Sequence, residues 1–517
     1  MLQNNPKLKA LIMSLWNALW GGGIANPITA IEQITYLLFI KRIDELESKR
    51  EKDGELKGET YKSKFDGQQE LRWSYFSQAE MTPLEMHSHV KEKVFPFIKK
   101  MGDEASSFTK NMEDAVFGIR KPSLLVEAVK KVDEIFKEIE EDAKDGKQSF
   151  QDIQGDVYEM LLKEIATSGK NGQFRTPRNL IKLLAELTEP KLGDKIADPA
   201  CGTGGFLLGA YQYILADLAR QKDASKLTTD EDGFERATTS SFLNESEKQT
   251  LNDSLYGFDM DITMVRLGLM NLMMHGIDDP HINYKDTLSK NYNENGIYNI
   301  VLANPPFTGK LDKAGVSPDL GIDTRSTELL FLARISKMLC EGGKAAVIVP
   351  EGVLFGSHKA QKATREILLK DNQLEAVISL PTGVFKPYTG VKTAILQFTK
   401  VKENSETWHT KKVWFYALKN DGYSLDDTRR KLKENPLPTV KTEFTTRIDA
   451  EYPDRKNHFF VPIDEIQEND LDLSYNRYNE YEYKEQEYDP PREIMAKLIT
   501  LEEEILADMN ELNELIR

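Results

Sequence analysis

Cysteine is scarce in this chain, and no long apolar run is present. Only Cys201 and Cys340 occur among 517 residues, so no disulfide framework is expected, and a reducing cytoplasm suits the chain. The apolar segment 8–25 is interrupted by Ser14 and Asn17, and no other stretch approaches the ~20 apolar residues of a membrane span. We therefore predict a cytoplasmic protein with no membrane contact and interpret the first segment as an amphipathic helix.

Positive charge is also in deficit. Lys and Arg together number 68 against 84 for Asp and Glu, which gives a net charge of −16. The overall field of an acidic chain does not attract a polyphosphate, so any contact with DNA must use local basic patches or a basic partner. The content of 40% hydrophobic and 29% charged residues is that of a globular protein, long enough for about two to four domains.

One strand in the middle of the chain ends at a pair of prolines. Residues 298–303 predict a short apolar strand, which Pro305 and Pro306 stop because neither can donate a ladder hydrogen bond. At that strand end, the Asn304 side-chain oxygen and the Pro305 carbonyl are two acceptors suited to one NH2 group, such as the exocyclic amine of adenine. Phe307 offers an apolar face for stacking the base. An ordinary turn after a buried strand is the alternative interpretation.

A glycine-rich turn follows an earlier strand. Residues 198–206 read Asp-Pro-Ala-Cys-Gly-Thr-Gly-Gly-Phe, between a short strand over 195–198 and an apolar helix pattern. Glycines let a ligand approach the backbone, and the helix N-terminus favours an anionic group. Leu207 stands where a dinucleotide fingerprint needs its third glycine, and no Lys-Ser/Thr pair follows, which disfavours nicotinamide, flavin and Walker A sites. Cys201 is not directly preceded by the proline that is typical of the nucleophile of cytosine-C5 methyltransferases, which excludes that class of transferase.

Four motifs in this order resemble those of S-adenosylmethionine-dependent amino-methyltransferases of DNA. They are Gln-Phe-Arg-Thr-Pro-Arg at 173–178, the glycine turn at 198–206, Gly-Phe-Asp at 257–259 and Asn-Pro-Pro-Phe at 304–307. More narrowly, the set resembles the modification (M) subunit of type I restriction-modification systems, and the resemblance covers most of the chain. It implies transfer of a methyl group from S-adenosyl-L-methionine to N6 of adenine in DNA.

No metal site is expected, because the pair His87 and His89 has no further ligand at metal spacing. The resemblance implies two groups of site residues. The catalytic group is Asn304, Pro305, Pro306 and Phe307, with no strong general base. The cofactor group is Gln173, Phe174, Arg175, Thr176, Pro177, Arg178, Asp198, Gly202, Thr203, Gly204, Gly205, Asp259 and Asp286.

For three of the cofactor residues, the local sequence also indicates a role. Asp259 ends a strand over 255–259, where doubly wound folds hold a ribose diol. Asp286 follows a third strand and is a candidate for the adenine amine of the cofactor, with capping of a turn as an equal alternative. Thr176 is expected to cap a helix that begins with Pro177.

The implied partners are DNA, a specificity (S) subunit that chooses the sequence, a second copy of the modification subunit, and a restriction (R) subunit in the full complex. Two other functions stay open. One is a solitary DNA or RNA amino-methyltransferase with its own recognition domain, and the other is a non-catalytic scaffold that only binds the cofactor.

We expect an α/β protein, with a doubly wound Rossmann-like methyltransferase domain, a helical N-terminal domain and a C-terminal helical extension. The boundaries are 1–145 for the helical domain, 150–420 for the methyltransferase domain, 421–490 for a charged and aromatic connecting region, and 491–517 for a helix that docks a subunit.

Within these parts, helices are predicted over 8–20, 27–47, 85–100 and 123–139, and a strand over 392–399 is expected to close the sheet. Segment 48–69 reads as a solvated connection, 221–250 as an insertion or mobile loop, and 308–324 as a mobile loop over the target base. The last helix carries a seam that needs a partner surface in this chain or another, formed by Leu498, Leu501, Ile505, Met509, Leu512 and Ile516.

Overall fold

The computed structural model describes residues 5–24, 26–58, 61–78, 80–144, 160, 176–237, 240–402, 405–450, 452, 454–480 and 491–515. The chain divides into two units, Met1–Tyr478 and Asn479–Arg517. Throughout the described ranges, no helix is long and apolar enough to cross a membrane.

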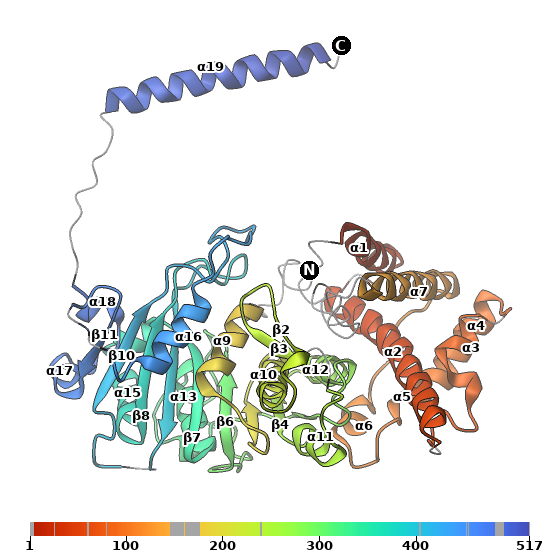
Figure 1. The fold of residues 1–517 in the computed structure, drawn as a ribbon, viewed down its shortest axis with the longest axis horizontal. Coiled ribbons are helices and arrows are strands. Elements are labelled where there is room, and N and C mark those ends of the chain that lie inside the picture. Colours follow the sequence, from red (N-terminus) through yellow and green to blue (C-terminus); the bar gives the residue numbers. More distant parts are fainter. Residues whose placement is uncertain are drawn as a thin grey trace. The chain divides into compact units, whose positions relative to one another are not determined.

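The N-terminal part consists of helices. They are α1 (Pro6–Gly21), α2 (Pro27–Lys57), α3 (Trp73–Phe76), α4 (Pro83–His89), α5 (Phe95–Lys99), α6 (Ser107–Met112) and α7 (Pro122–Lys144), and a π-helical turn over Val90–Val94 joins α4 to α5 (Figure 1). Side chains of Asn5, Asn26 and Thr82 cap α1, α2 and α4, each ahead of a proline in the first turn. The four predicted helices are confirmed.

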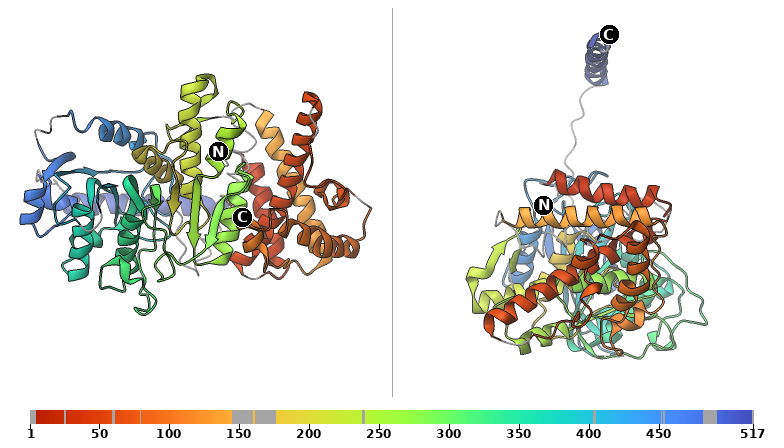
Figure 2. Two further views of the ribbon diagram at one scale, coloured as in Figure 1. Left: turned by 90° about the horizontal axis from the view of Figure 1, so that it is seen from below. Right: turned by 90° about the vertical axis from the view of Figure 1, so that its right-hand side faces the viewer.

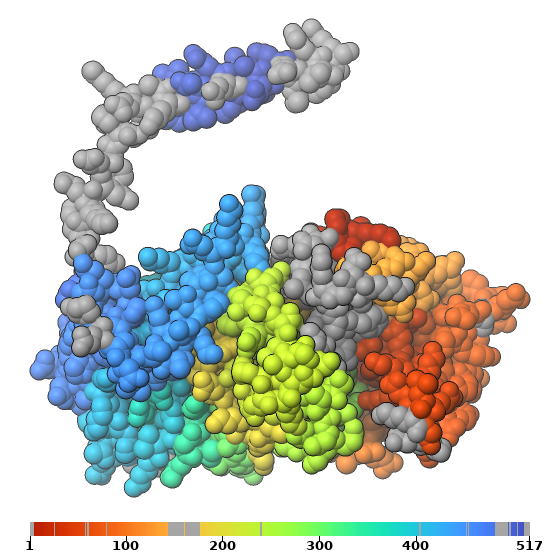
Figure 3. All heavy atoms as spheres, in the orientation of Figure 1, coloured from red at the N-terminus to blue at the C-terminus, as the bar shows by residue number. Residues whose placement is uncertain are grey.

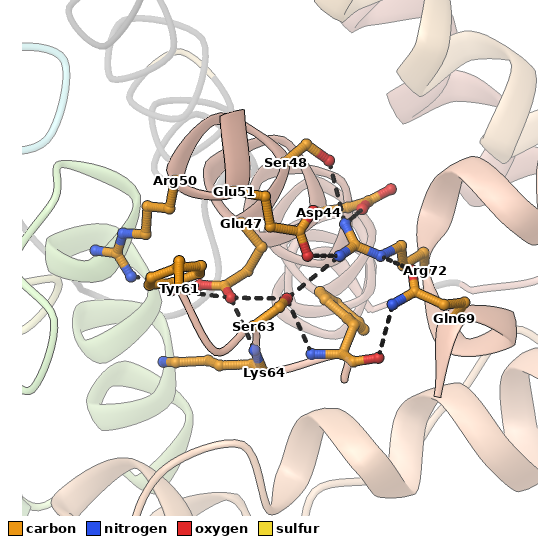
Figure 4. Close-up of polar contacts among 11 residues, drawn as sticks. Asp44, Glu47, Ser48, Arg50, Glu51, Tyr61, Ser63, Lys64, Gln69 and Arg72 are labelled. Carbon is orange, nitrogen blue, oxygen red and sulfur yellow. Dashed lines mark hydrogen bonds and ion pairs between the residues drawn. The ribbon is translucent and has the colours of Figure 1, made fainter. Parts of the chain in front are cut away.

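Helix α2 runs on to Lys57, so the predicted solvated connection over 48–69 is wrong in its first part. The helix extends this far because Arg72, a buried residue in the segment after α2, binds its side chains. Its guanidinium donates to Asp44 at 2.9 Å and also contacts Glu51 (Figure 4). The second half of α2 is therefore held by partners that its own polar sequence does not reveal.

A second buried group of the same helix binds the loop that follows. The Glu47 carboxylate accepts hydrogen bonds from the Tyr61 hydroxyl at 3.0 Å, the Ser63 hydroxyl at 3.1 Å and the Lys64 backbone amide at 2.8 Å (Figure 4). Together with Arg72, this network fastens segment 61–72 to α2.

Among the described residues, nine strands form one sheet in the order β11-β10-β8-β9-β7-β6-β1-β4-β5. They are β1 (Ile196–Asp198), β4 (Leu255–Asp259), β5 (His281–Tyr284), β6 (Tyr298–Ala303), β7 (Leu339–Pro350), β8 (Asn372–Ser379), β9 (Thr393–Lys400), β10 (Lys412–Ala417) and β11 (His458–Pro462). Strands β5, β4, β1, β6 and β7 are parallel neighbours, so their carboxyl ends lie along one edge of the sheet.

Both faces of this sheet are buried, which confirms the doubly wound α/β fold. Ile300 and Leu302 of β6 belong to one hydrophobic cluster, and Val301 and Ala303 belong to the other. The first cluster includes residues of α9 (Arg178–Thr188), α10 (Gly205–Lys222) and α12 (Ile262–Met274), and the second includes residues of α13 (Thr327–Met338) and α15 (Lys359–Lys370). Figure 2 shows helices on both sides of the sheet.

The prediction that 392–399 closes the sheet is wrong. Strand β9 is antiparallel to both β7 and β8 and lies between them, and the sheet continues through β8 to β10 and β11. The segment expected to be a connecting region thus contributes an outer strand. It also forms α16 (Leu437–Thr446), α17 (Ile463–Glu468) and α18 (Tyr475–Tyr478), and it belongs to the first unit as far as Tyr478.

The insertion at 221–250 has regular structure. It forms the hairpin of β2 (Leu227–Thr229) and β3 (Glu235–Ala237), followed by α11 (Glu245–Asn252). Lys182 of α9 lies 2.6 Å from Asp230 and 2.7 Å from Asp232, and the Asn435 amide donates to the Asp232 carbonyl at 2.6 Å. The hairpin is therefore fixed between α9 and the segment after β10 (Figure 3).

The N-terminal helices meet the sheet at its β5 edge. The Asn111 amide of α6 donates to the Ile282 carbonyl at 3.3 Å, and the Ser107 hydroxyl donates to the Asn283 side chain at 3.1 Å. Through these contacts, the N-terminal helices and the sheet belong to one unit.

The second unit contains α19 (Pro491–Leu515). Four apolar side chains of its predicted seam, Leu498, Leu501, Ile505 and Met509, are each between 52% and 65% exposed. Ile516 lies outside the described residues.

Candidate active site

Three neighbouring strands bring the candidate residues together. Strand β1 ends at Asp198, β4 ends at Asp259, and Asn304 directly follows β6. Because β1 is parallel to β4 on one side and to β6 on the other, these three side chains lie at the same edge of the sheet. Ligands of doubly wound folds bind at this edge.

The glycine turn is fastened to the neighbouring strand. The Cys201 amide donates to the Phe258 carbonyl, and the Gly202 amide donates to an Asp259 carboxylate oxygen, both at 2.9 Å. Gly202 and Gly204 have φ of +52° and +75°, which side-chain-bearing residues rarely adopt. A Cβ on Gly202 would meet no described atom within 4 Å, so the space beside this backbone is open to a ligand.

Two carboxyl groups, buried Asp198 and half-buried Asp259, lie beside the turn. Burial raises the pKa of Asp198 to about 8, and the nearby Asp259 adds to the rise. Burial also raises the pKa of Asp259, against hydrogen bonds from the Asp261 and Gly202 amides. Because both ionised forms are disfavoured, a cationic ligand nearby would stabilise them. Each Asp259 oxygen accepts one of these amides and keeps a lone pair, which leaves acceptor capacity for a hydroxyl pair.

Asp286 follows β5 and closes a turn. Its carboxylate accepts from the Leu288 amide at 2.9 Å, and the Thr287 hydroxyl donates to the Pro199 carbonyl at 3.2 Å. The turn is thus joined to the glycine turn. Met260, directly after β4, and Tyr284, the last residue of β5, are 57% and 60% exposed near this edge of the sheet.

Asn304 has one half of its amide paired. Its Nδ2 donates to the Thr176 hydroxyl at 2.9 Å, whereas its Oδ1 is buried and has no hydrogen-bond donor in the described part of the chain. Leaving a buried acceptor unpaired costs about 1–3 kcal/mol. The oxygen predicted to receive the amine is therefore free to accept from a ligand.

The prediction that Thr176 caps a helix is wrong. Helix α9 begins at Arg178, and its N-cap is Pro177, without a side-chain cap. The Thr176 hydroxyl contacts Asn304 instead, a partner 128 residues away that local sequence cannot reveal.

Phe307 is only 6% exposed, and its ring packs edge-on against Phe385, with centroids 5.6 Å apart and an interplanar angle of 88°. Of the two prolines before it, Pro305 is buried and Pro306 is exposed. The loop that carries Phe385 therefore contributes to the surroundings of the Asn-Pro-Pro-Phe motif.

The loop over 308–324 is anchored at its far end. The guanidinium of Arg334, fully buried on α13, donates to both Asp319 oxygens at 3.1 and 3.2 Å and to Asn295 at 2.8 Å. Leu320 is 1% exposed. Mobility of this loop over a base stays a prediction.

Part of the predicted cofactor segment is not described. Gln173, Phe174 and Arg175 lie outside the described residues. Where side chains are described, no group of three or more His, Cys, Asp or Glu residues is arranged to hold a metal ion. His87 and His89 each have a ring nitrogen 2.8 Å from a backbone carbonyl, of Ile119 and Glu70 respectively.

A glycine turn, strand-end carboxylates and an Asn-Pro-Pro-Phe strand end on this sheet define a methyltransferase of the class that modifies amino groups. The model of the N-6 DNA methylase family matches residues 149–487, and the model of the HsdM N-terminal domain matches residues 8–132. The chain belongs to the N-6 DNA methylase family.

Named relatives agree with this assignment. The methylase subunit of the type I restriction enzyme EcoEI from Escherichia coli is 29% identical over 521 residues, which cover 96% of this chain and 94% of the relative. The EcoKI methylase subunit from Escherichia coli strain K12 is 28% identical over 434 residues, which cover 81% and 72%.

Solved structures show the same fold. A chain from a type I R-M system has a TM-score of 0.64 at 24% identity, with 99% of both chains covered. The methyltransferase subunit of a type I restriction-modification system from Streptococcus thermophilus has a TM-score of 0.63 at 19% identity, with 92% of this chain and 100% of that chain covered.

The family match and the named relatives together identify the present chain as an adenine-specific N6 DNA methyltransferase of the type I modification-subunit kind.

Proposed function

We propose that Asn304 and the Pro305 carbonyl hold the N6 amine of a flipped adenine while it attacks the methyl group of S-adenosyl-L-methionine. The observation that best supports this is the buried Asn304 Oδ1, an acceptor without a donor in the described part of the chain. It lies one strand away from the glycine turn, at the edge where the cofactor would bind.

The low nucleophilicity of the adenine N6 amine determines what the site must do. The N6 lone pair is delocalised into the adenine ring, and two acceptors on its hydrogens favour a tetrahedral, more nucleophilic nitrogen. The cofactor would supply an electrophilic methyl group on a sulfonium, and its sulfur would leave as a neutral thioether with the electron pair of the broken S–CH3 bond. The chain contributes by orienting the amine and by stacking the base on Phe307, and the displaced proton passes to water, so no strong base is needed.

The side chains at the β4 and β1 ends fit this cofactor. Asp259 retains acceptors for a ribose diol, and the carboxyls of Asp198 and Asp259, whose pKa values are both raised, favour a nearby cation. Open space beside Gly202 suits close approach of the ligand. We assign residues 173–178 to the methionine part of the cofactor and Asp286 to its adenine amine, as the family resemblance implies.

We further propose that the chain acts in the cytoplasm within a complex. Its partners would be DNA, a specificity subunit, a second modification subunit and a restriction subunit. A net charge of −16 and the exposed apolar side chains of α19 support recognition of DNA through a partner rather than by this chain alone.

Substitution of Asn304 tests the proposal. Asn304→Ala should lower methyl transfer to unmethylated DNA about 10²–10³-fold, measured with radiolabelled cofactor and the specificity subunit present. Calorimetric affinity for S-adenosyl-L-methionine should not change, because the lost acceptor acts on the amine. Asn299→Ala, at the other end of β6, is the matched control and should keep the rate. A fully active Asn304→Ala enzyme would refute the catalytic assignment.

A further inference from the structure

The side-chain amide of Asn304 has two orientations with nearly the same shape. One presents the carbonyl oxygen to an incoming amine, and the other, rotated by half a turn, presents an NH2 group that repels it. Methyl transfer needs the first orientation. The contacts of Nδ2 therefore decide how often the catalytic acceptor is available.

The hydrogen bond to Thr176 stabilises the productive orientation in this structure. Nδ2 of Asn304 lies 2.9 Å from the Thr176 hydroxyl oxygen, which accepts its hydrogen, and this contact leaves Oδ1 unpaired. In the opposite orientation Oδ1 would face the hydroxyl, and the NH2 group would take the place meant for the acceptor.

Thr176 is itself held in place. It is 7% exposed, and it precedes Pro177, whose ring restricts the backbone. The next turn is fixed by Asn179, whose amide donates at 3.0 Å to the carboxylate of Asp421, a fully buried residue that also pairs with Arg429. A β-branched side chain on such a backbone has few rotamers, so the position of its hydroxyl is well defined.

We propose that Thr176 is a positioning residue of the methyl-transfer reaction, whose hydroxyl orients the Asn304 amide so that its oxygen faces the target amine. This inference rests on the proposed function. It assigns the Thr176 side chain to the base-binding side of the site, whereas the family resemblance placed the residue with the cofactor.

The test compares three variants of the full chain, assembled with its specificity subunit. Thr176→Val keeps the shape and removes the hydroxyl, Thr176→Ser keeps the hydroxyl, and Thr176→Ala guards against strain from valine. Thr188→Val is the matched control, since Thr188 is a fully buried threonine at the end of α9, the helix that follows Thr176, and its hydroxyl donates only to backbone carbonyls.

We expect Thr176→Val and Thr176→Ala to lower kcat about tenfold or more, because a misplaced group costs a large part of the rate even when it is present. Thr176→Ser should restore most of the rate, and Thr188→Val should keep it. The calorimetric Kd for S-adenosyl-L-methionine and the KM for DNA should stay near the unmodified values in all four proteins.

Three results would overturn the inference. They are an unchanged kcat in Thr176→Val, a rate loss that follows a loss of cofactor affinity, and unfolding of both the valine and alanine variants, which would make the role structural. Asn304→Ala in the same assay separates the two proposals. If Asn304→Ala is inactive while Thr176→Val is fully active, only the inference about Thr176 fails.

Discussion

The guanidinium of Arg266, on α12, lies 3.3 Å from the carboxylate of Glu32, on α2 of the N-terminal helices. Its Nε also donates to the Asn111 carbonyl at 2.9 Å. The two charged side chains are 9% and 13% exposed. This buried ion pair therefore connects the helical part of the first unit to the methyltransferase sheet.

Removing that cation should destabilise the first unit. Arg266→Met leaves Glu32 buried without its charge partner, and the expected loss in the free energy of unfolding is about 3 kcal/mol, measured in urea. Arg220→Met is the control, because Arg220 and its partner Glu235 are 44% and 47% exposed, and such pairs contribute less than about 1 kcal/mol. Equal losses in the two variants would show that the buried pair does not join the parts.

The buried carboxyl of Asp198 should make stability depend on pH. Because its pKa is raised to about 8, the folded state keeps a proton that the unfolded chain releases near pH 4. The resulting stabilisation is complete below about pH 4 and is lost as pH rises through about 8. Asp198→Asn does not ionise and still offers an acceptor to the Ala200 amide. Its melting temperature relative to the unmodified protein should rise between pH 5 and 9, and a constant difference would contradict the shift.

Alanine variants of Phe307 and Phe385, whose rings are in contact, should distinguish the role of Phe307 in packing from its role in stacking the base. Either change to alanine should cost about 3–5 kcal/mol of stability, with a coupling of about 0.5–1.5 kcal/mol in a double-mutant cycle. Only Phe307→Ala should also lose a further 1–3 kcal/mol or so in kcat/KM through weaker stacking of the base. Equal kinetic losses in the two variants would mean that Phe307 does not contact the base.

Helix α19 should be needed for assembly and not for folding. Deleting residues 491–517 should leave the melting temperature and cofactor binding unchanged and abolish co-elution with the specificity subunit. Ile505→Asp in the apolar seam should act likewise, whereas Glu503→Gln, on the opposite side of the helix, should not. The alternative is that the seam packs on the α/β domain. Unfolding of the truncated chain, or intact assembly, would exclude the docking role.

Local patterns predicted the parts of the fold that depend on local chemistry. Strands β4 and β6 have the predicted boundaries, 255–259 and 298–303, because each is a buried apolar run followed by residues that change the direction of the chain. The glycine turn and the residues around Asn304 were predicted to be a site, and the parallel strands bring them to one edge of the sheet.

Distant partners explain the rest. The charged half of α2 reads as a loop because Arg72, which binds it, is 21 residues beyond Glu51. The place of β9 between β7 and β8 depends on pairing across the whole sheet and leaves no local signal. Thr176 reads as a helix cap because sequence gives no indication that its hydroxyl meets Asn304.

Strand β5 is the last strand on its side of the sheet, and α6 covers it through Asn111 and Ser107. An uncovered edge strand offers free backbone groups to any other chain and promotes aggregation. The match to the HsdM N-terminal domain ends at residue 132, and the match to the N-6 DNA methylase family begins at residue 149, so the catalytic part could be expressed alone. Such a fragment would keep the methyl-transfer motifs but lose the cover of β5, so we expect it to aggregate through that edge. We therefore expect the N-terminal helices to keep the β5 edge from pairing with other chains.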